Sequence, residues 1–448
     1  MRVLRTVTLL ALVGMLAIVA CRAASPRREA EPWLFQLTWD EAATTLRGEL
    51  SAPAGVRLAP ARADDARPLR FVAANERTRR WTLDLRAAAS AIDDVDLLAA
   101  RGSGFVGTLT SLLWLPDEAP DDAAFALRVT PPDGHTFVCA SKGDGSDRYR
   151  GELADLRAGP ACAFGAIAVR RFTVAGVDIT VAEPDPRREA AMQSLDAHVR
   201  ECAEAVAKWY GAFPVDRLLL LVLPTRGPLV GSGAARGFGG ASIRLDAPHH
   251  LGAKQYARDW VLIHEMVHLA MPSLPAAHHW LEEGSATYLE PWIQLQAGRV
   301  RAVDVWTALL SDYEQGLAEP AAGGLDGDDS WGRTYYGGAL FCLLADLRIR
   351  ERTHGARSLR DAMRALPAAG ANLLTTSPIE DVLARGDAAT GTNVLRELYD
   401  AMGRRPLAVD LPALWRELGV RLVDGRAVFD DAAPRAWLRS SLFVADAR

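Results

Sequence analysis

The pentad at positions 264–268, His-Glu-Met-Val-His, constrains this chain more than any other feature. Two histidines four residues apart lie about 40° apart around an α-helix, so His264 and His268 project from one face and can hold one metal ion. Glu265 follows the first histidine, in place to take a proton from a water bound to that ion. Apolar residues flank the pentad and Pro272 follows it, which predicts a buried helix that ends before the proline.

A second motif, Trp-Leu-Glu-Glu-Gly-Ser-Ala-Thr-Tyr at 280–288, provides a candidate third ligand. A hydrolytic zinc site of this kind takes three protein ligands and keeps an open position for water. The motif lies on a predicted helix over residues 280–296 and carries two adjacent carboxylates, Glu282 and Glu283. A carboxylate from this helix would complete the ligand set.

These two motifs resemble those of the gluzincin zinc metallopeptidases, specifically the aminopeptidase N and glycyl aminopeptidase branch. In that branch a Trp-Leu-Asn-Glu-Gly-type segment follows the pentad. The resemblance implies one Zn²⁺ per chain, held by His264, His268 and Glu283, with Glu265 as the catalytic general base. It also implies a thermolysin-like catalytic domain.

The resemblance extends to two Gly-rich stretches on either side of these motifs. Tyr-Tyr-Gly-Gly at 335–338 is similar to the family's Tyr-x-x-Gly helix start, which implies that Tyr335 stabilises the oxyanion, with Tyr336 as the alternative. A stretch before the pentad falls where the family has an edge strand that pairs with the substrate backbone. This match implies that the substrate-binding residues include Gly239, Gly240 and Ala241.

The chain departs from the family in that edge-strand stretch. Aminopeptidase N relatives carry a glutamate there that binds the free amine of the substrate. In this chain the corresponding residues include no acid, and the nearest carboxylate, Asp246, comes four or five residues late. We therefore expect hydrolysis at zinc to carry over better than specificity for the N-terminal residue.

Glu290 is a candidate for a hydrogen bond to a zinc-bound imidazole. It lies seven positions after Glu283, about two helical turns, so both side chains share a helix face. A carboxylate placed there can accept the outer N–H of a zinc-bound imidazole, which fixes the tautomer and raises the basicity of the ring. The alternative is an exposed glutamate at a helix end, before Pro291.

The first twenty residues predict export. Arg2 and Arg5 precede an apolar run over 7–20. This run is too short for a membrane-spanning helix, which needs about 20 residues. The run ends in Ile-Val-Ala-Cys, which resembles the lipobox of bacterial lipoprotein signal peptides and implies cleavage before Cys21 and diacylation of its thiol. We expect a cell-envelope lipoprotein anchored to the membrane through Cys21. The alternative is an ordinary signal peptide or an uncleaved anchor.

The 448 residues are too many for one ordinary core, so we expect an α+β protein of two or three domains. A signal peptide (1–20) and a tether (21–31) precede short apolar runs that predict a β-rich N-terminal domain over 32–184. Helical periodicity and buried strands over 185–356 predict the catalytic domain, and 357–448 is predicted to be a helical C-terminal segment.

Charge and cysteine usage narrow the class of protein further. The 51 Lys and Arg residues against 56 Asp and Glu give a net charge of −5, which argues against a nucleic-acid-binding protein. If Cys21 carries lipid, four cysteines remain. Cys139 and Cys162 lie in strand-like runs and are the expected disulfide pair, whereas Cys202 and Cys342 lie on predicted helices as buried thiols.

The sequence thus predicts a zinc metallopeptidase of the bacterial cell envelope that acts on peptide or protein substrates and cleaves like an endopeptidase. Two alternatives stay open. One is an aminopeptidase of the same family, and the other is a non-catalytic lipoprotein that binds peptides on a peptidase scaffold. All positions expected of a working site are filled, which favours an enzyme.

Overall fold

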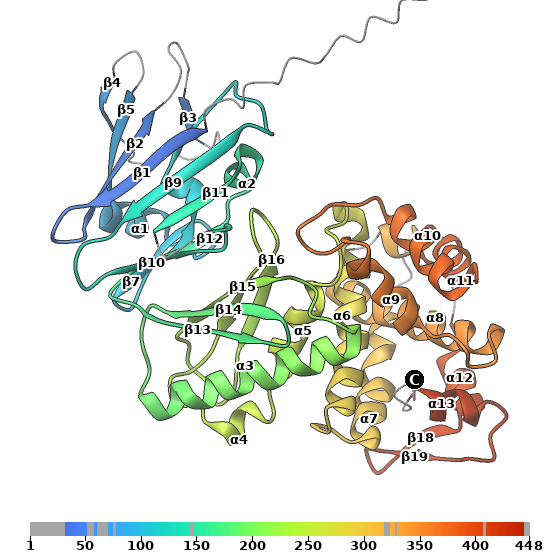
Figure 1. The fold of residues 1–448 in the computed structure, drawn as a ribbon. Helices are drawn as coiled ribbons and strands as arrows, with labels where there is room; N and C mark the ends of the chain where they lie inside the picture. The colour runs from blue at the N-terminus through green and yellow to red at the C-terminus, as the bar shows by residue number, and fades with distance from the viewer. Residues whose placement is uncertain are drawn as a thin grey trace, which may run out of the picture.

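The computed structural model describes residues 32–51, 58–60, 70–74, 78–143, 147–317, 323–327, 329–405 and 409–442. The expected signal peptide, tether and acylated Cys21 lie outside these ranges. No helix within them combines the length and the apolar character that crossing a membrane requires. The described chain forms a β-rich N-terminal domain, a central sheet covered by helices, and a helical C-terminal part (Figure 1).

The N-terminal domain consists of two main sheets that share one core. The larger sheet has the strand order β11 (Arg148–Glu152), β9 (Ala124–Thr130), β1 (Trp33–Trp39), β2 (Thr45–Ser51), β5 (Thr78–Asp84) and β4 (Arg70–Ala74). The smaller has the order β10 (Thr136–Cys139), β12 (Ala161–Gly165), β7 (Gly104–Thr108) and β6 (Leu98–Arg101). Short elements complete it: β3 (Leu58–Pro60), β8 (Trp114–Pro116), α1 (Leu85–Ile92) and α2 (Leu153–Arg157). A β-rich domain was predicted for this region.

The central sheet has five strands in the order β13 (Ala168–Val174), β14 (Val177–Glu183), β15 (Arg217–Leu223), β17 (Ser242–Asp246) and β16 (Ser232–Arg236). The inner strands β14, β15 and β17 run parallel, and both edge strands are antiparallel to their neighbours. This sheet extends across the expected domain boundary at residue 184. Its first two strands precede that residue and pair with the strands that follow it.

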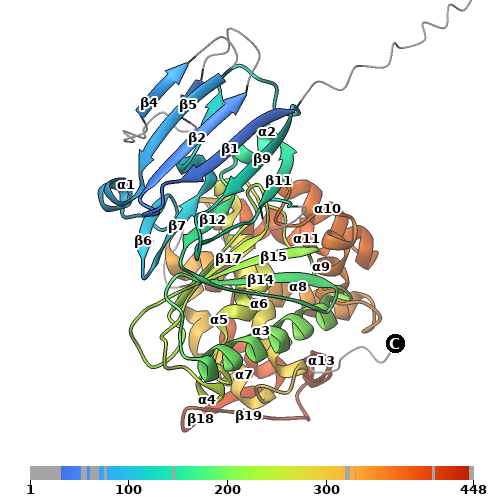
Figure 2. The ribbon, with the colours of Figure 1, turned by 60° about the vertical axis from the view of Figure 1, so that its left-hand side comes forward.

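Both faces of the central sheet are covered. On one face, side chains such as Leu220 and Ile243 pack against α3 (Glu189–Tyr210) and α5 (Val261–His268). On the other face, Leu219 and Leu221 pack against the smaller N-terminal sheet. Figure 2 shows the N-terminal strands on one side of the sheet and α3 on the other. Burial on both faces explains why β15 is apolar at nearly every position, with no alternation.

The C-terminal part is mainly helical. Its elements are α4 (Ala253–Tyr256), α6 (His279–Gln296), α7 (Ala302–Asp312), the π-helix Arg333–Gly337, α8 (Gly338–Arg352), α9 (Leu359–Ala368), α10 (Ile379–Thr390), α11 (Val394–Leu398), the π-helix Tyr399–Gly403, α12 (Leu411–Leu418), α13 (Ala436–Ser441) and the hairpin β18 (Val420–Val423) to β19 (Arg426–Phe429). Helices α6 and α8 cross so closely that a Cβ added at Gly284 would lie 2.3 Å from the Cα of Gly338. This crossing brings the Arg333–Gly337 π-helix next to the start of α6.

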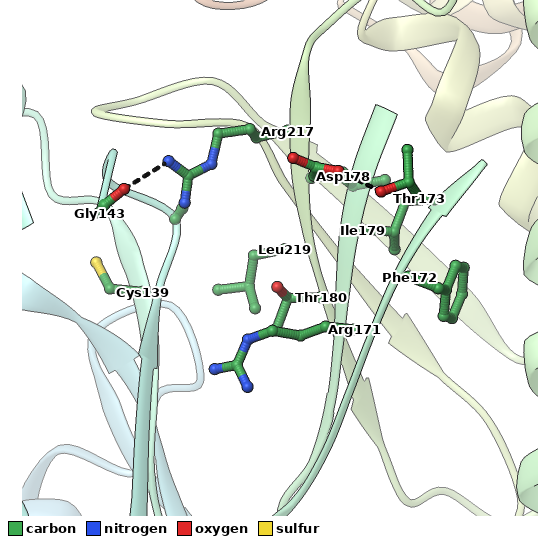
Figure 3. A pocket seen from close by; sticks show the side chains of 12 residues that line it. Cys139, Gly143, Arg171, Phe172, Thr173, Asp178, Ile179, Thr180, Arg217 and Leu219 are labelled. Carbon is green, nitrogen blue, oxygen red and sulfur yellow. Dashed lines mark hydrogen bonds between the residues drawn. The ribbon is translucent and has the colours of Figure 1, made fainter. Parts of the chain in front are cut away.

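A cavity of about 590 Å³ lies between the N-terminal domain and the central sheet (Figure 3). Arg217 of β15 spans it and donates a hydrogen bond of 3.2 Å to the Gly143 carbonyl oxygen, and Cys139 forms part of the opposite wall. None of the candidate metal ligands lines this cavity. It marks the junction of two domains, away from the predicted chemistry.

The expected disulfide is not present. Cys139 and Cys162 are directly opposite each other on β10 and β12, as free thiols. Burial raises the pKa of the Cys139 thiol to about 11 and also raises the pKa of the Cys162 thiol. Both thiols are therefore neutral and pack as apolar groups. Cys202 and Cys342 are buried thiols on α3 and α8, as predicted.

Candidate metal centre

Helix α5, which carries the pentad, is tied to α3 at its start. The Oδ1 atom of Asp259 accepts a hydrogen bond of 2.9 Å from the Val261 backbone N–H, and its Oδ2 lies 2.6 Å from Nε2 of His198 on α3. Burial alone lowers the pKa of His198, but Cys202 and the hydrogen bond to Asp259 raise it to about 9. The imidazolium and the carboxylate are thus paired at neutral pH, and this pair fixes where the pentad begins.

Three donor atoms converge on one point between α5 and α6. The two Nε2 atoms of His264 and His268 lie 3.2 Å apart, and they lie 3.3 and 3.4 Å from Oε2 of Glu283. Ligands held at about 2.0–2.1 Å by a tetrahedral zinc ion lie about 3.3–3.4 Å from one another. Within the described residues, no other three His, Cys, Asp or Glu side chains converge in this way. The donor set and its spacing therefore fit zinc.

Glu283, and not its neighbour Glu282, faces the two histidines. Burial opposes a charge on Glu283, but the two imidazoles outweigh it and hold the pKa of this carboxyl well below its usual range. Both oxygens of Glu282 are used elsewhere: Oε1 accepts a hydrogen bond of 2.9 Å from the Leu274 backbone N–H, and Oε2 lies 2.8 Å from Nδ1 of His279. Glu282 thus fastens the loop that leads into α6.

Glu265 points between the candidate ligands and the edge strand β16. It is 7% exposed, and a Cβ added at Gly233 of β16 would lie 2.4 Å from its Cγ. Burial raises the pKa of Glu265, whereas His268 and His264 act in the opposite direction. A buried carboxyl with a raised pKa suits a general base that accepts a proton near neutral pH.

Replacing Gly233 with alanine is expected to reduce kcat/KM by about 100-fold, because the added methyl group pushes Glu265 out of place and misplacement by about 1 Å has effects of that size. The measurement is peptide hydrolysis at matched zinc content. Gly252→Ala is the control, since its added Cβ would have no heavy atom nearer than 3.7 Å. Equal rates in the two variants would contradict the packing of Glu265 against Gly233.

Tyr335 closes the site from the π-helix that precedes α8. Its ring lies 6.4 Å from that of His264, with 19° between the planes. Burial, together with the charge of Glu283, raises the pKa of Tyr335 to about 12, so the hydroxyl keeps its proton at neutral pH and can donate it in a hydrogen bond. Tyr335 lines the hollow that contains the candidate ligands, whereas Tyr336 lines only a neighbouring pocket. The geometry favours Tyr335 as the donor.

The predicted substrate-binding residues Gly239, Gly240 and Ala241 do not lie on the edge strand. The two glycines form a turn with φ of 66° and 146° that packs against the N-terminal domain, and Ala241 is buried. The edge strand is β16, Ser232–Arg236, which lines a hollow of about 270 Å³ with the candidate ligands and Glu265. Sequence reasoning missed it because Ser-Gly-Ala-Ala-Arg has neither β-branched residues nor alternation.

Glu290 does not contact the histidines. Its Oε1 accepts a hydrogen bond from the Gln294 side-chain amide, and the described residues give no hydrogen bond between Glu290 and either imidazole. The alternative of an exposed helix-end glutamate is also wrong, since only 8% of the residue is exposed. Glu290 lines a pocket that opens from the metal centre.

Three exposed aromatic side chains lie around the centre, and no sequence pattern indicated that they are exposed. Phe238, just after β16, is 50% exposed and lines the same hollow as the ligands. Trp260 and Trp331 are 52% and 59% exposed and line the pocket that contains Glu290. Exposed aromatic residues around a concave site are typical of surfaces that bind ligands.

Comparisons with known proteins agree with this architecture. No protein-family model and no curated protein matches the sequence. Among solved structures, an aminopeptidase N family protein from Idiomarina loihiensis is similar over 87% of this chain and 78% of that one, with 14% identity and a TM-score of 0.62. A two-domain M1 zinc metallopeptidase bound to L-arginine is similar over 85% of this chain and 95% of its own, with 15% identity and a TM-score of 0.52. An M1 zinc metallopeptidase from Deinococcus radiodurans covers 85% and 94%, with 14% identity and a TM-score of 0.50. The chain therefore has the mixed α+β fold of the M1 zinc metallopeptidases, with a β-rich N-terminal region and a helical C-terminal part.

Proposed function

We propose that this protein is a zinc-dependent peptidase. The observation that carries the proposal is the spacing of 3.2–3.4 Å among the donor atoms of His264, His268 and Glu283, with Glu265 beside them. A degenerate, non-catalytic scaffold would lack one ligand or the base. In this chain all four side chains are present and converge on one hollow.

The residues around the centre have different roles in hydrolysis. When bound, zinc supplies a Lewis acid that polarises the scissile carbonyl and lowers the pKa of the attacking water. Glu265 accepts the proton of that water and later delivers it to the leaving amine. Tyr335 donates a hydrogen bond to the developing oxyanion, and removal of one such donor typically costs about 3–4 kcal/mol in kcat. The edge strand β16 pairs with the backbone of the substrate.

Dependence on zinc tests this proposal against a peptide-binding scaffold. We expect about one zinc per mature chain, loss of peptide hydrolysis after chelation, and recovery when zinc is restored. A peptide library analysed by mass spectrometry provides the substrates. A purified protein without stoichiometric zinc, or one that leaves the library intact with zinc bound, would favour the non-catalytic alternative.

We further propose that the enzyme cleaves internal bonds. An N-terminal ammonium buried beside β16 needs an acidic partner, because an uncompensated charge costs several kcal/mol. Two acids that contact β16 are already engaged: Asp96 pairs with Arg236 at 2.7 Å, and Asp246 accepts a hydrogen bond of 2.6 Å from Ser232. Glu282 is held by the loop before α6. This distribution supports an endopeptidase over the alternative of an aminopeptidase.

Acetylation of the substrate's N-terminus is therefore expected to change kcat/KM by less than about threefold. The comparison uses free and acetylated forms of one cleaved peptide at constant pH. A loss above about 100-fold on acetylation, equivalent to about 2.7 kcal/mol, would show that the amine is recognised and that the enzyme is an aminopeptidase.

We also propose that the enzyme is exported and anchored through lipid on Cys21, on the basis of the lipobox-like sequence alone. Cys21→Ser is expected to abolish incorporation of labelled palmitate and to release the protein from the membrane fraction. Retention of label in that variant would contradict the anchor.

A further inference from the structure

A second pocket opens from the metal centre on the far side of Glu265. Its volume is about 480 Å³, and it lies between the first half of β16, the start of α5, α6, α7 and the Trp331–Tyr336 segment. His264, Glu265 and Tyr335 line both this pocket and the hollow of about 270 Å³ that contains the candidate ligands, so the two spaces are adjacent. Its walls are mainly apolar and aromatic, with contributions from Trp260, Val305, Leu309, Tyr313, Trp331 and Tyr336.

Apart from His264, the lining of this pocket carries acidic side chains and no basic ones. Besides Glu265, two carboxyls line it, Glu290 and Asp312, and no Lys or Arg does. Glu290 is more than nine-tenths buried, and among the described residues its one hydrogen-bond partner is Gln294, at Oε1. Its Oε2 has no protein donor in that part of the chain. The described residues also give the Asp312 side chain no hydrogen bond or ion pair.

Such carboxyls favour a cationic ligand. Burial raises the pKa of Glu290 to about 8, although its hydrogen bond to Gln294 and the charge of Arg299 act in the opposite direction. Burial also raises the pKa of Asp312. A cation bound in the pocket would stabilise the charged forms of both carboxyls. The apolar stem of an arginine or lysine would cover the apolar walls, and its charged end would lie near the rings of Trp260, Trp331 and Tyr336.

We propose that this pocket binds the side chain of an arginine or lysine that follows the scissile bond. The inference rests on the proposed peptidase function and adds a substrate class to it. The pocket borders the start of β16, at Gly231 to Gly233. The hollow of about 270 Å³ that contains the candidate ligands borders the rest of the strand, through Arg236. A peptide that pairs antiparallel with β16, the stronger of the two pairings, places its residues after the scissile bond at the start of the strand.

The test uses blocked peptides that differ at one position, with Arg, Lys, Leu or Glu directly after the scissile bond. We expect kcat/KM to be at least tenfold higher for Arg and Lys than for Leu, and lowest for Glu. In the double variant Glu290→Gln/Asp312→Asn, the ratio of the Arg to the Leu peptide should fall at least fivefold. Asp312→Asn alone, at a partly exposed position, should lower the same ratio if the double variant does not fold.

Glu314→Gln is the matched control. Glu314 is an exposed acid two residues beyond Asp312 and lies outside the pocket, so its removal should leave the Arg-to-Leu ratio unchanged. Equal rates for Arg and Leu peptides in the wild type, or an unchanged ratio in the folded pocket variants, would overturn this inference and leave the peptidase function intact. Failure to cleave any peptide with zinc bound would instead contradict the peptidase function.

Discussion

Replacement of Glu265 with glutamine is expected to lower kcat for peptide hydrolysis by about 10²–10⁴-fold, the usual contribution of a general base. The amide keeps the shape of the side chain, so its packing against Gly233 is preserved. It cannot accept the proton of the attacking water, and that step loses its base. Zinc content and the thermal unfolding midpoint should stay close to those of the wild type, because Glu265 is not one of the converging ligands.

The measurement is single-peptide kinetics on protein whose zinc content has been determined by elemental analysis. Glu314→Gln, the same chemical change on the surface, is the control and should retain full activity. A Glu265→Gln rate within about tenfold of the wild type, with zinc bound, would show that another group accepts the proton.

The metal centre could be predicted from the sequence because its signals are local. The two histidines lie one helical turn apart, so the helix alone aligns them. The loop to α6 is short, so the Glu282–Glu283 pair lies close to the histidines. Tyr335 precedes a helix start that the Gly-Gly pair marks. The position of Tyr335 at the site, in contrast, depends on a long-range contact, because the crossing of α6 and α8 brings it there.

The edge strand could not be predicted because its signal is tertiary. Ser232–Arg236 is a strand because it pairs with β17, and small residues are required there because Glu265 packs against Gly233. Gly239 and Gly240 are also glycines of close approach, but their neighbours are Asp155 and Ala140 of the N-terminal domain. A glycine in the sequence can indicate that another part of the chain approaches its backbone closely, but only the fold shows which part that is.

The position of Glu290 shows the same limit of sequence reasoning. Helical spacing correctly placed Glu290 and Glu283 on one helix, but two turns carry the later side chain about 10.5 Å along the axis. That distance takes Glu290 past the imidazoles and into the pocket lined by α7. Shared helix face is a weaker constraint than shared height along the helix.

The two adjacent glutamates of α6 provide the sharpest test of the metal centre. Glu283→Ala removes one of three donor atoms that lie 3.2–3.4 Å apart, and it leaves His264 and His268 facing each other without a carboxylate between them. Loss of a residue that is hydrogen-bonded to a zinc ligand lowers zinc affinity by about 10–100-fold. Loss of the ligand itself is expected to lower zinc affinity by more than that. Hydrolysis should fall with zinc occupancy.

Glu282→Ala makes the same chemical change one residue earlier and should leave zinc bound. It removes the acceptor of the Leu274 backbone N–H and the partner of His279, so we expect a loss of stability of about 1–3 kcal/mol instead. Zinc titration by competition with a chelator and thermal unfolding, on both variants, separate these two effects. Comparable loss of zinc in both variants, or loss in Glu282→Ala alone, would contradict the assignment of Glu283 as the ligand.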